Sequence, residues 1–234
     1  MTNLSYYIDA VERSIAMAEC GYSKLTQFHT VIEGMSSYKG RRFLNNLLEL
    51  QPRTDKTRYL EVGSWKGSTL CAATFGNDIE AVAIDDFSQF QTTTFGVDKR
   101  HPRDALQQNL GLNRLFSKPQ FNASIIDGDA FKVDPAQLGL FDVYLYDGEH
   151  TFDAHYRALT HFITALQDTF ILVVDDYRNL PEDGTHQATE KALADLQWKA
   201  EKDWFLWEPC DGTDMGRQAN GWWNGLRVSV VSKS

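Results

Sequence analysis

The chain has 234 residues, of which 42% are hydrophobic and 24% charged, a composition typical of a globular protein with a sizeable core. Its formal net charge of -9 argues against nucleic acid as a partner, because phosphate recognition needs a basic surface. No apolar run approaches the roughly 20 residues that span a bilayer, and the N-terminus lacks the pattern of a signal peptide. The cysteines Cys20, Cys71 and Cys210 are few and scattered. We therefore expect reduced thiols, a cytoplasmic location and no membrane partner.

The first 50 residues are predicted to form helices. Val11, Ile15 and Ala18 share one face of a first helix, and a second apolar stretch covers residues 43–50. The polar segment 33–37 between them is predicted to be a loop. A charged connection precedes residue 57. We therefore divide the chain into an N-terminal helical cap, residues 1–56, and a second domain, residues 57–234.

From residue 57 onwards, short apolar segments alternate with helical patterns, which is typical of a parallel sheet with helices on both faces. One helix is predicted across residues 156–166, and another over 185–202 with Thr185 as its N-cap. No helix separates the last two strands, which predicts an antiparallel hairpin at one sheet edge. The predicted strands cover residues 59–62, 81–84, 123–126, 143–146, 170–174, 204–207 and 226–231.

A glycine-containing loop follows the first of these strands. Glu61, Gly63 and Gly67 form the pattern E-x-G-x-x-x-G, and Asp85 ends the next strand. A nicotinamide or flavin site has the closer spacing G-x-G-x-x-G, which brings backbone N–H groups to a pyrophosphate. The looser loop favours a neutral or cationic ligand beside a carboxylate, at the sheet edge where parallel strands end.

At these residues, and in its late antiparallel strands, the chain resembles the class I S-adenosylmethionine-dependent methyltransferases. The resemblance implies an α/β fold with a Rossmann-like, doubly wound, mostly parallel sheet of seven strands, an antiparallel C-terminal hairpin and N-terminal helices. It also implies that Asp85 binds the ribose hydroxyls of S-adenosylmethionine and that the turn at Asp129 contacts adenine. The cofactor-binding residues that it implies are Glu61, Gly63, Ser64, Gly67, Ser68, Asp85, Asp129, Ala130 and Asp147.

Further carboxylates end two other predicted strands. Asp147, Asp175 and Asp176 should meet at the same sheet edge, where they repel one another unless a cation neutralises them. That cation is the sulfonium of the cofactor or a hard divalent ion such as magnesium. The D-G-x-H and D-D-Tyr patterns resemble small-molecule and sugar O-methyltransferases, whose metal-dependent members bind magnesium at these positions. By that resemblance the three aspartates are candidate metal ligands, and a metal-free acidic cleft is the open alternative.

His150 is the candidate general base, and it lies three residues beyond Asp147. An imidazole titrates near neutrality, which suits removal of a hydroxyl proton, although a purely structural turn residue is equally open. His150 and Asp147 form the predicted catalytic pair for O-methylation of a hydroxyl on a small metabolite or sugar. A metal-dependent hydrolase using His150 and the three aspartates, and a non-catalytic cofactor-binding domain, are the alternatives. The partner is expected to be a small-molecule acceptor, and a homo-oligomer is left open.

Overall fold

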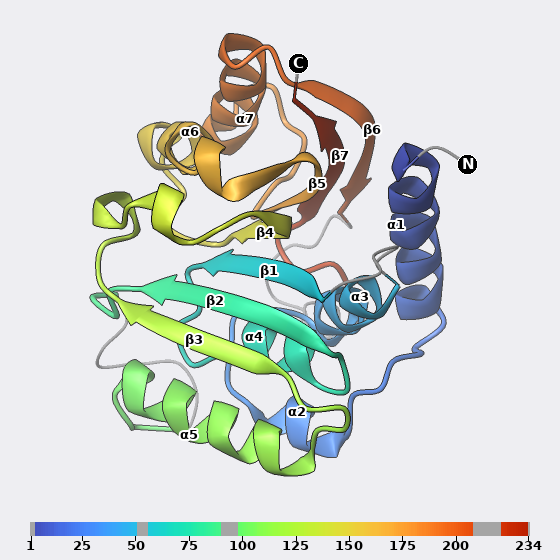
Figure 1. Cartoon of the computed structure of the whole chain (residues 1–234), viewed down its shortest axis with the longest axis vertical. Helices are drawn as coiled ribbons and strands as arrows, with labels where there is room; N and C mark the ends of the chain where they lie inside the picture. Colours follow the sequence, from blue (N-terminus) through green and yellow to red (C-terminus); the bar gives the residue numbers. More distant parts are fainter. Residues whose placement is uncertain (1–2, 51–55, 90–97, 208–220, 234) are drawn as a thin grey trace.

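The computed structural model describes residues 3–50, 56–89, 98–207 and 221–233. Within this part, one sheet of seven strands has the order β3-β2-β1-β4-β5-β7-β6 (Figure 1). The strands β1 to β5 pair in parallel, whereas β7 is antiparallel to both β5 and β6. This confirms the predicted mostly parallel sheet with an antiparallel hairpin at one edge. The strands are β1 (Thr57–Val62), β2 (Ile79–Asp85), β3 (Asn122–Asp127), β4 (Phe141–Tyr146), β5 (Leu166–Asp175), β6 (Lys199–Leu206) and β7 (Leu226–Ser232).

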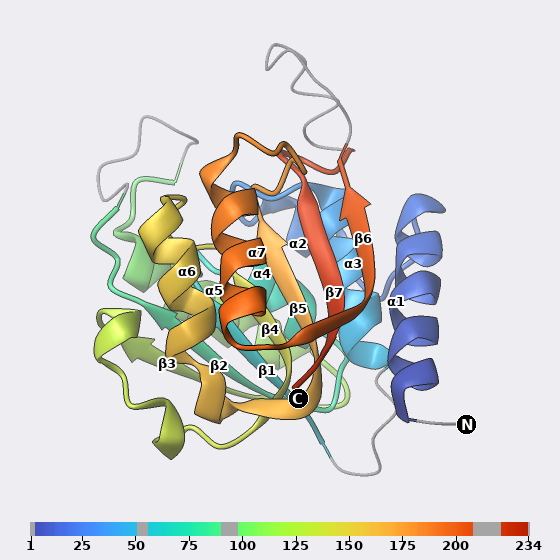
Figure 2. The ribbon, with the colours of Figure 1, turned by 90° about the horizontal axis from the view of Figure 1, so that it is seen from above.

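Helices cover both faces of the sheet and create two apolar cores (Figures 1 and 2). Successive strand residues point to opposite faces, so in β1 Tyr59 joins one core and Leu60 the other. The first core packs against α1 (Asn3–Glu19), α3 (Tyr38–Glu49), α4 (Ser68–Thr74) and α5 (Pro102–Phe116), with the short α2 (Gln27–Val31) beside α4. The second packs against α6 (Phe152–His161) and α7 (Gly184–Asp195). Short 3-10 turns are η1 (Ala130–Lys132), η2 (Pro135–Gln137) and η3 (Ile163–Ala165).

The N-terminal helices share their core with the sheet. Val11 and Ala18 of α1 are buried in the same cluster as Phe43 of α3 and Val228 of β7. Trp222, just before β7, is buried edge-on against Phe43, and its Nε1 donates to Glu19 at the end of α1 (2.8 Å). The predicted loop at residues 33–37 lies between α2 and α3, as expected.

Several element boundaries differ from the prediction. The helix expected over 185–202 ends at Asp195, because Gln197 adopts a left-handed backbone (φ 55°) and residues from Lys199 onwards extend into β6. Its N-cap is Asp183, whose carboxylate accepts from the N–H of Thr185 (3.1 Å). The preceding helix α6 likewise ends at His161, before β5 begins.

Among the described residues, no helix combines the length and apolar character that crossing a bilayer requires. Cys20 and Cys71 are free thiols, while Cys210 lies outside the described residues.

Candidate functional site

The glycine loop between β1 and α4 is shaped by close backbone approaches. Gly63 has a φ of +89°, and a Cβ there would lie 1.9 Å from the carbonyl oxygen of Asp147. The N–H of Asp147 donates to the Val62 carbonyl (2.8 Å), so the ends of β1 and β4 touch at this point. Gly67, with a φ of +83°, is the N-cap of α4. The backbone of Asp147 therefore excludes a side chain at Gly63, and the left-handed φ of Gly67 favours glycine there.

Asp85 holds this loop directly. Its Oδ2 accepts from the backbone N–H groups of Ser64 (2.8 Å) and Trp65 (2.7 Å), and its Oδ1 accepts from that of Phe87 (2.7 Å). Burial raises the pKa of the Asp85 carboxyl, and these three bonds oppose that rise. The structure thus brings Asp85 and the glycine loop together and gives the carboxylate a structural role. Its contact with a ribose stays a prediction.

Glu61 is buried behind the loop. Its Oε2 accepts from the hydroxyl of Tyr59 (2.5 Å) and its Oε1 from that of Thr69 (2.9 Å). Burial raises the pKa of Glu61 to about 7. The residue therefore joins β1 to the first turn of α4 and carries only part of its negative charge near neutral pH.

A buried ion pair fastens the loop to distant segments, and we call it the latch. The Nζ of Lys66, whose side chain is 0% exposed, donates to Glu33 Oε2 (2.8 Å) and to the Asp98 carbonyl (2.7 Å). The other oxygen of Glu33 accepts from the Asp98 N–H (2.7 Å). No spacing in the sequence links Glu33, Lys66 and Asp98, so sequence reasoning missed the latch.

The N-terminal loop at residues 33–37 covers the start of α4. A Cβ on Gly34 would lie 1.9 Å from the hydroxyl oxygen of Ser68, and Ser36 hydrogen-bonds to that same hydroxyl (3.1 Å). Ser68, a predicted cofactor-binding residue, is therefore buried under this loop. Its contact with a cofactor stays a prediction.

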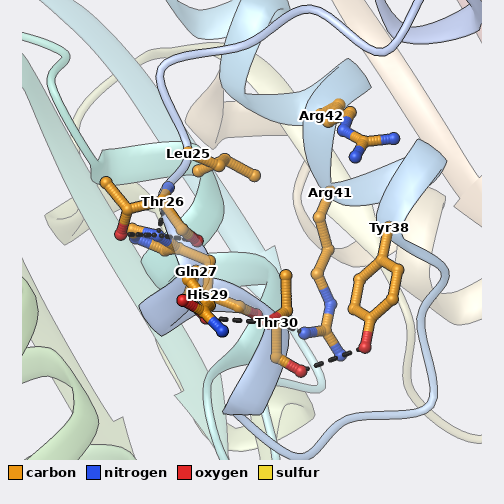
Figure 3. A pocket seen from close by; sticks show the side chains of 8 residues that line it. All are labelled: Leu25, Thr26, Gln27, His29, Thr30, Tyr38, Arg41 and Arg42. Atoms are coloured by element: carbon orange, nitrogen blue, oxygen red, sulfur yellow. Dashed lines mark hydrogen bonds between the residues drawn. The ribbon is translucent and has the colours of Figure 1, made fainter.

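Arg41 of α3 supports this loop from behind, beside a pocket between α2 and α3 (Figure 3). Its Nη1 donates to the carbonyls of His29 (2.7 Å) and Ile32 (2.9 Å), and its Nε donates to Ser36 (3.0 Å). Burial lowers the pKa of Arg41 to about 10. The guanidinium shapes the loop through backbone carbonyls.

The predicted acidic cluster forms at the carboxyl ends of β4 and β5. His150 Nε2 lies 3.4 Å from Asp176 Oδ2 and 3.9 Å from Asp147 Oδ1. Burial and repulsion from neighbouring carboxylates raise the pKa of Asp147 well above its usual range and that of Asp175 to about 7. The structure therefore brings together the three aspartates and His150, and the site favours a bound cation.

Strained backbone accompanies this sheet edge. Trp65, Phe87, Asp176 and Asn179 have φ values of 43°, 53°, 53° and 56°, although none is a glycine. They follow the ends of β1, β2 and β5. Such strain persists only where the surrounding structure enforces it, and it is common at functional sites.

Arg227 of β7 fixes the turn after β5 and was not found from the sequence. It is 2% exposed, and its Nη1 donates to the hydroxyl of Tyr177 (3.0 Å), the residue after Asp176. The same hydroxyl contacts Nδ1 of His186 (2.8 Å). A lone arginine in a strand gives no sequence signal for such a contact.

Asp129 occupies the turn after β3, beside Asp85. The N–H of Gly128 donates to the Asp85 carbonyl (3.0 Å), and the Asp129 carboxylate accepts from the N–H of Phe131 (2.9 Å). This bond lowers the pKa of Asp129, and Ala130 begins η1. The predicted adenine turn thus lies next to the predicted ribose site, and its contact with adenine is untested.

The three aspartates provide the oxygen donors that magnesium prefers. In the part of the chain that the structure describes, however, no group of three or more His, Cys, Asp or Glu side chains is arranged to hold a metal ion. The predicted ligands Asp147, Asp175 and Asp176 are thus neighbours without a preformed coordination shell.

Solved structures share this fold. No family model and no curated protein matches the sequence. An O-methyltransferase from Bacillus cereus in complex with SAH is 14% identical, with a TM-score of 0.55 over 96% of this chain and 91% of that one. The O-methyltransferase TomG from Streptomyces achromogenes, involved in tomaymycin synthesis and in complex with SAM, is 14% identical, with a TM-score of 0.55 over 99% of both chains.

A Pyrococcus horikoshii protein proposed to be an RNA methyltransferase is also 14% identical, with a TM-score of 0.54 over 95% of this chain and 97% of that one. At such low identity the likeness shows the fold alone. The chain has the fold of the class I S-adenosylmethionine-dependent methyltransferases. Because proteins with different acceptors share it, the fold does not select the acceptor.

Proposed function

We propose that the chain is an S-adenosylmethionine-dependent methyltransferase that O-methylates a hydroxyl on a small metabolite or sugar. The observation that carries this proposal is the acidic cluster of Asp147, Asp175 and Asp176 beside the glycine loop, because a cationic ligand relieves its repulsion. The net charge of -9 supports a small acceptor over RNA. No observation in the described part of the chain favours a hydrolase or a non-catalytic domain.

In this proposal the residues at the carboxyl ends of the strands bind and orient the cofactor. When bound, S-adenosylmethionine supplies a methyl group on a positively charged sulfur. The loop at Gly63 and Gly67 lets the cofactor approach the backbone closely, while Asp85 and Asp129 take the ribose and adenine ends. Glu61, Ser64, Ser68, Ala130 and Asp147 complete the proposed cofactor site.

His150 is the proposed base. It is 38% exposed, so an acceptor hydroxyl can reach its ring, and uptake of the proton gives a cation 3.4 Å from Asp176 Oδ2. That carboxylate stabilises the charged imidazole. Asp147, 3.9 Å away, contributes to the same stabilisation.

We also propose a magnesium site, on the ground that the three aspartates supply the oxygen ligands that this ion prefers. Asp147, Asp175 and Asp176 would hold the ion, and their carboxylates would have to turn toward a common point. A rise in melting temperature with magnesium, absent in Asp175→Asn, would support this site.

Isothermal titration with S-adenosylhomocysteine tests the proposed function. We expect binding by the wild type and an affinity at least about tenfold weaker in Asp85→Ala, which releases three loop N–H groups. The matched control is Asp78→Asn, because Asp78 precedes the opposite end of β2 and pairs with Lys56 on the surface (2.7 Å). Absence of binding by the wild type at millimolar ligand would refute the proposal.

A further inference from the structure

The pocket between α2 and α3 is separate from the proposed cofactor site (Figure 3). Its volume is about 200 Å³. Gln27 and Thr30 line it from α2, and Arg41 and Arg42 line it from α3. None of its lining residues belongs to the proposed cofactor site, so the pocket is a second place where a ligand can bind.

The two arginines bring uncompensated positive charge to this pocket. In the described part of the chain, neither Arg41 nor Arg42 forms an ion pair with an Asp or Glu side chain. Arg41 is 3% exposed, and burial lowers its pKa to about 10, so it stays charged at neutral pH. The carbonyls that accept from it are neutral and leave its charge in place. Buried charges are normally paired, so this one favours an anionic partner.

His29 lines the same pocket but adds no charge to it. Burial lowers the pKa of His29, which favours its neutral form. Its Nδ1 accepts from the N–H of Thr26 (3.1 Å), and its Nε2 lies 3.0 Å from Asn113 Oδ1. Both ring nitrogens are therefore engaged within the protein, and the charge of the pocket comes from the arginines.

The hydrogen-bonding groups around the pocket also favour an anion. The carbonyl of Gln27 accepts from the Thr30 hydroxyl (2.7 Å), and the carbonyl of Thr30 accepts from the Tyr38 hydroxyl (3.1 Å). By contrast, Nη2 of Arg41 makes a single, long hydrogen bond of 3.4 Å. The half-buried Arg42 guanidinium hydrogen-bonds to no side chain or carbonyl of the described residues. Donors are thus left over where acceptors are occupied, and arginine N–H groups bind oxyanions strongly.

We propose that this pocket binds a small oxyanion, a phosphate or carboxylate group, through Arg41 and Arg42. The site goes beyond the proposed methyltransferase activity. Its volume is below the roughly 300–1,000 Å³ of pockets for drug-sized ligands, so it suits one anionic group with few further atoms. A bound anion neutralises the Arg41 charge while Nη1 keeps its bonds to the carbonyls of His29 and Ile32.

Titration of the whole chain with inorganic phosphate at constant ionic strength tests this site. In 1H–15N spectra of arginine-labelled protein, the Nε–H signals of Arg41 and Arg42 should shift and reach saturation. They are identified by their loss in Arg41→Lys and Arg42→Gln. Arg42→Gln should weaken phosphate binding at least about fivefold. The matched control is Arg13→Gln, which removes the same charge from a 60% exposed side chain of α1 and should bind within about twofold of the wild type.

A parallel titration with succinate distinguishes the two oxyanions, because the anion that binds more tightly identifies the group that the pocket takes. Shifts that saturate with neither anion would overturn the proposal, and so would affinities that Arg42→Gln leaves unchanged. Arg42 makes no hydrogen bond that the fold needs, so its variant decides the question even if Arg41→Lys fails to fold. No cofactor is present in these titrations, so their outcome is independent of the proposed function.

Discussion

The latch should be a large single contribution to stability, and Glu33→Gln tests it. Lys66 is fully buried and Glu33 is 17% exposed, so the change leaves a desolvated ammonium group without its countercharge, and the amide has one oxygen for two donors, Lys66 Nζ and the Asp98 N–H. Removing one partner of a buried ion pair costs about 3–5 kcal/mol, because the other charge stays desolvated. In a domain of this size that corresponds to a fall in Tm of about 6–20 °C.

A double-mutant cycle measured by urea unfolding isolates the interaction energy of Glu33 and Lys66 from the other effects of each substitution. Lys66→Met should cost less than Glu33→Gln, since the glutamate retains some access to water. The double variant should be more stable than the sum of the two changes predicts, by more than about 1 kcal/mol. Asp9→Asn is the control, because the Asp9–Arg13 pair is 59% and 60% exposed and should contribute less than about 1 kcal/mol. Additive single effects would show that the latch does not act as a unit.

Gly63→Ala should abolish soluble folded protein, because its Cβ would lie 1.9 Å from the Asp147 carbonyl oxygen. Gly111→Ala in α5 should instead stabilise the protein by about 0.5–1 kcal/mol, because its Cβ would have no neighbouring atom within 4 Å. Circular dichroism and urea unfolding measure both effects. Burial lowers the pKa of the His155 imidazole to about 3, from its usual value near 6.5. The unfolded chain therefore binds the extra proton, and stability that is complete above about pH 6.5 should fall toward pH 3 by at most about 1.4 kcal/mol per pH unit. His155→Phe should flatten that slope in urea unfolding, and an unchanged slope would contradict the lowered pKa of His155. Arg227→Leu should weaken S-adenosylhomocysteine binding less than Asp85→Ala does, because Arg227 acts through Tyr177; calorimetry ranks the two.

Alternating strand and helix patterns predicted the sheet correctly, because each of the five parallel strands β1 to β5 contains a short apolar run that ends at a polar turn. The hairpin of β6 and β7 was also predictable, since no helical segment separates the two. The prediction of a helix over 185–202 was wrong beyond Asp195, because the backbone turns at Gln197. Residues 199–202 have ordinary helical composition, and their extended shape follows from pairing with β7, which local sequence does not encode.

The residues of the candidate site likewise include some that the sequence predicts and some that it does not. Residues at strand ends were predictable, because a parallel sheet gathers those ends along one edge, and Asp85, Asp147 and Asp176 duly lie there. The residues that support the site from behind could not be predicted. Glu33 and Lys66 are 33 positions apart, and Arg227 reaches Tyr177 across 50, so these contacts exist only once the chain has folded.

Gly63 shows why the glycine loop and the acidic cluster occur together. The strand order reverses beside β1, whose neighbours are β2 and β4, and the crossovers on its two sides leave on opposite faces of the sheet. At that switch point the backbone of Asp147 crosses the end of β1 so closely that only glycine fits at 63. The contact that demands the glycine also places the Asp147 carboxylate next to the loop. One topological feature therefore sets both the motif and the position of the carboxylate, and a residue larger than glycine at 63 would disturb both.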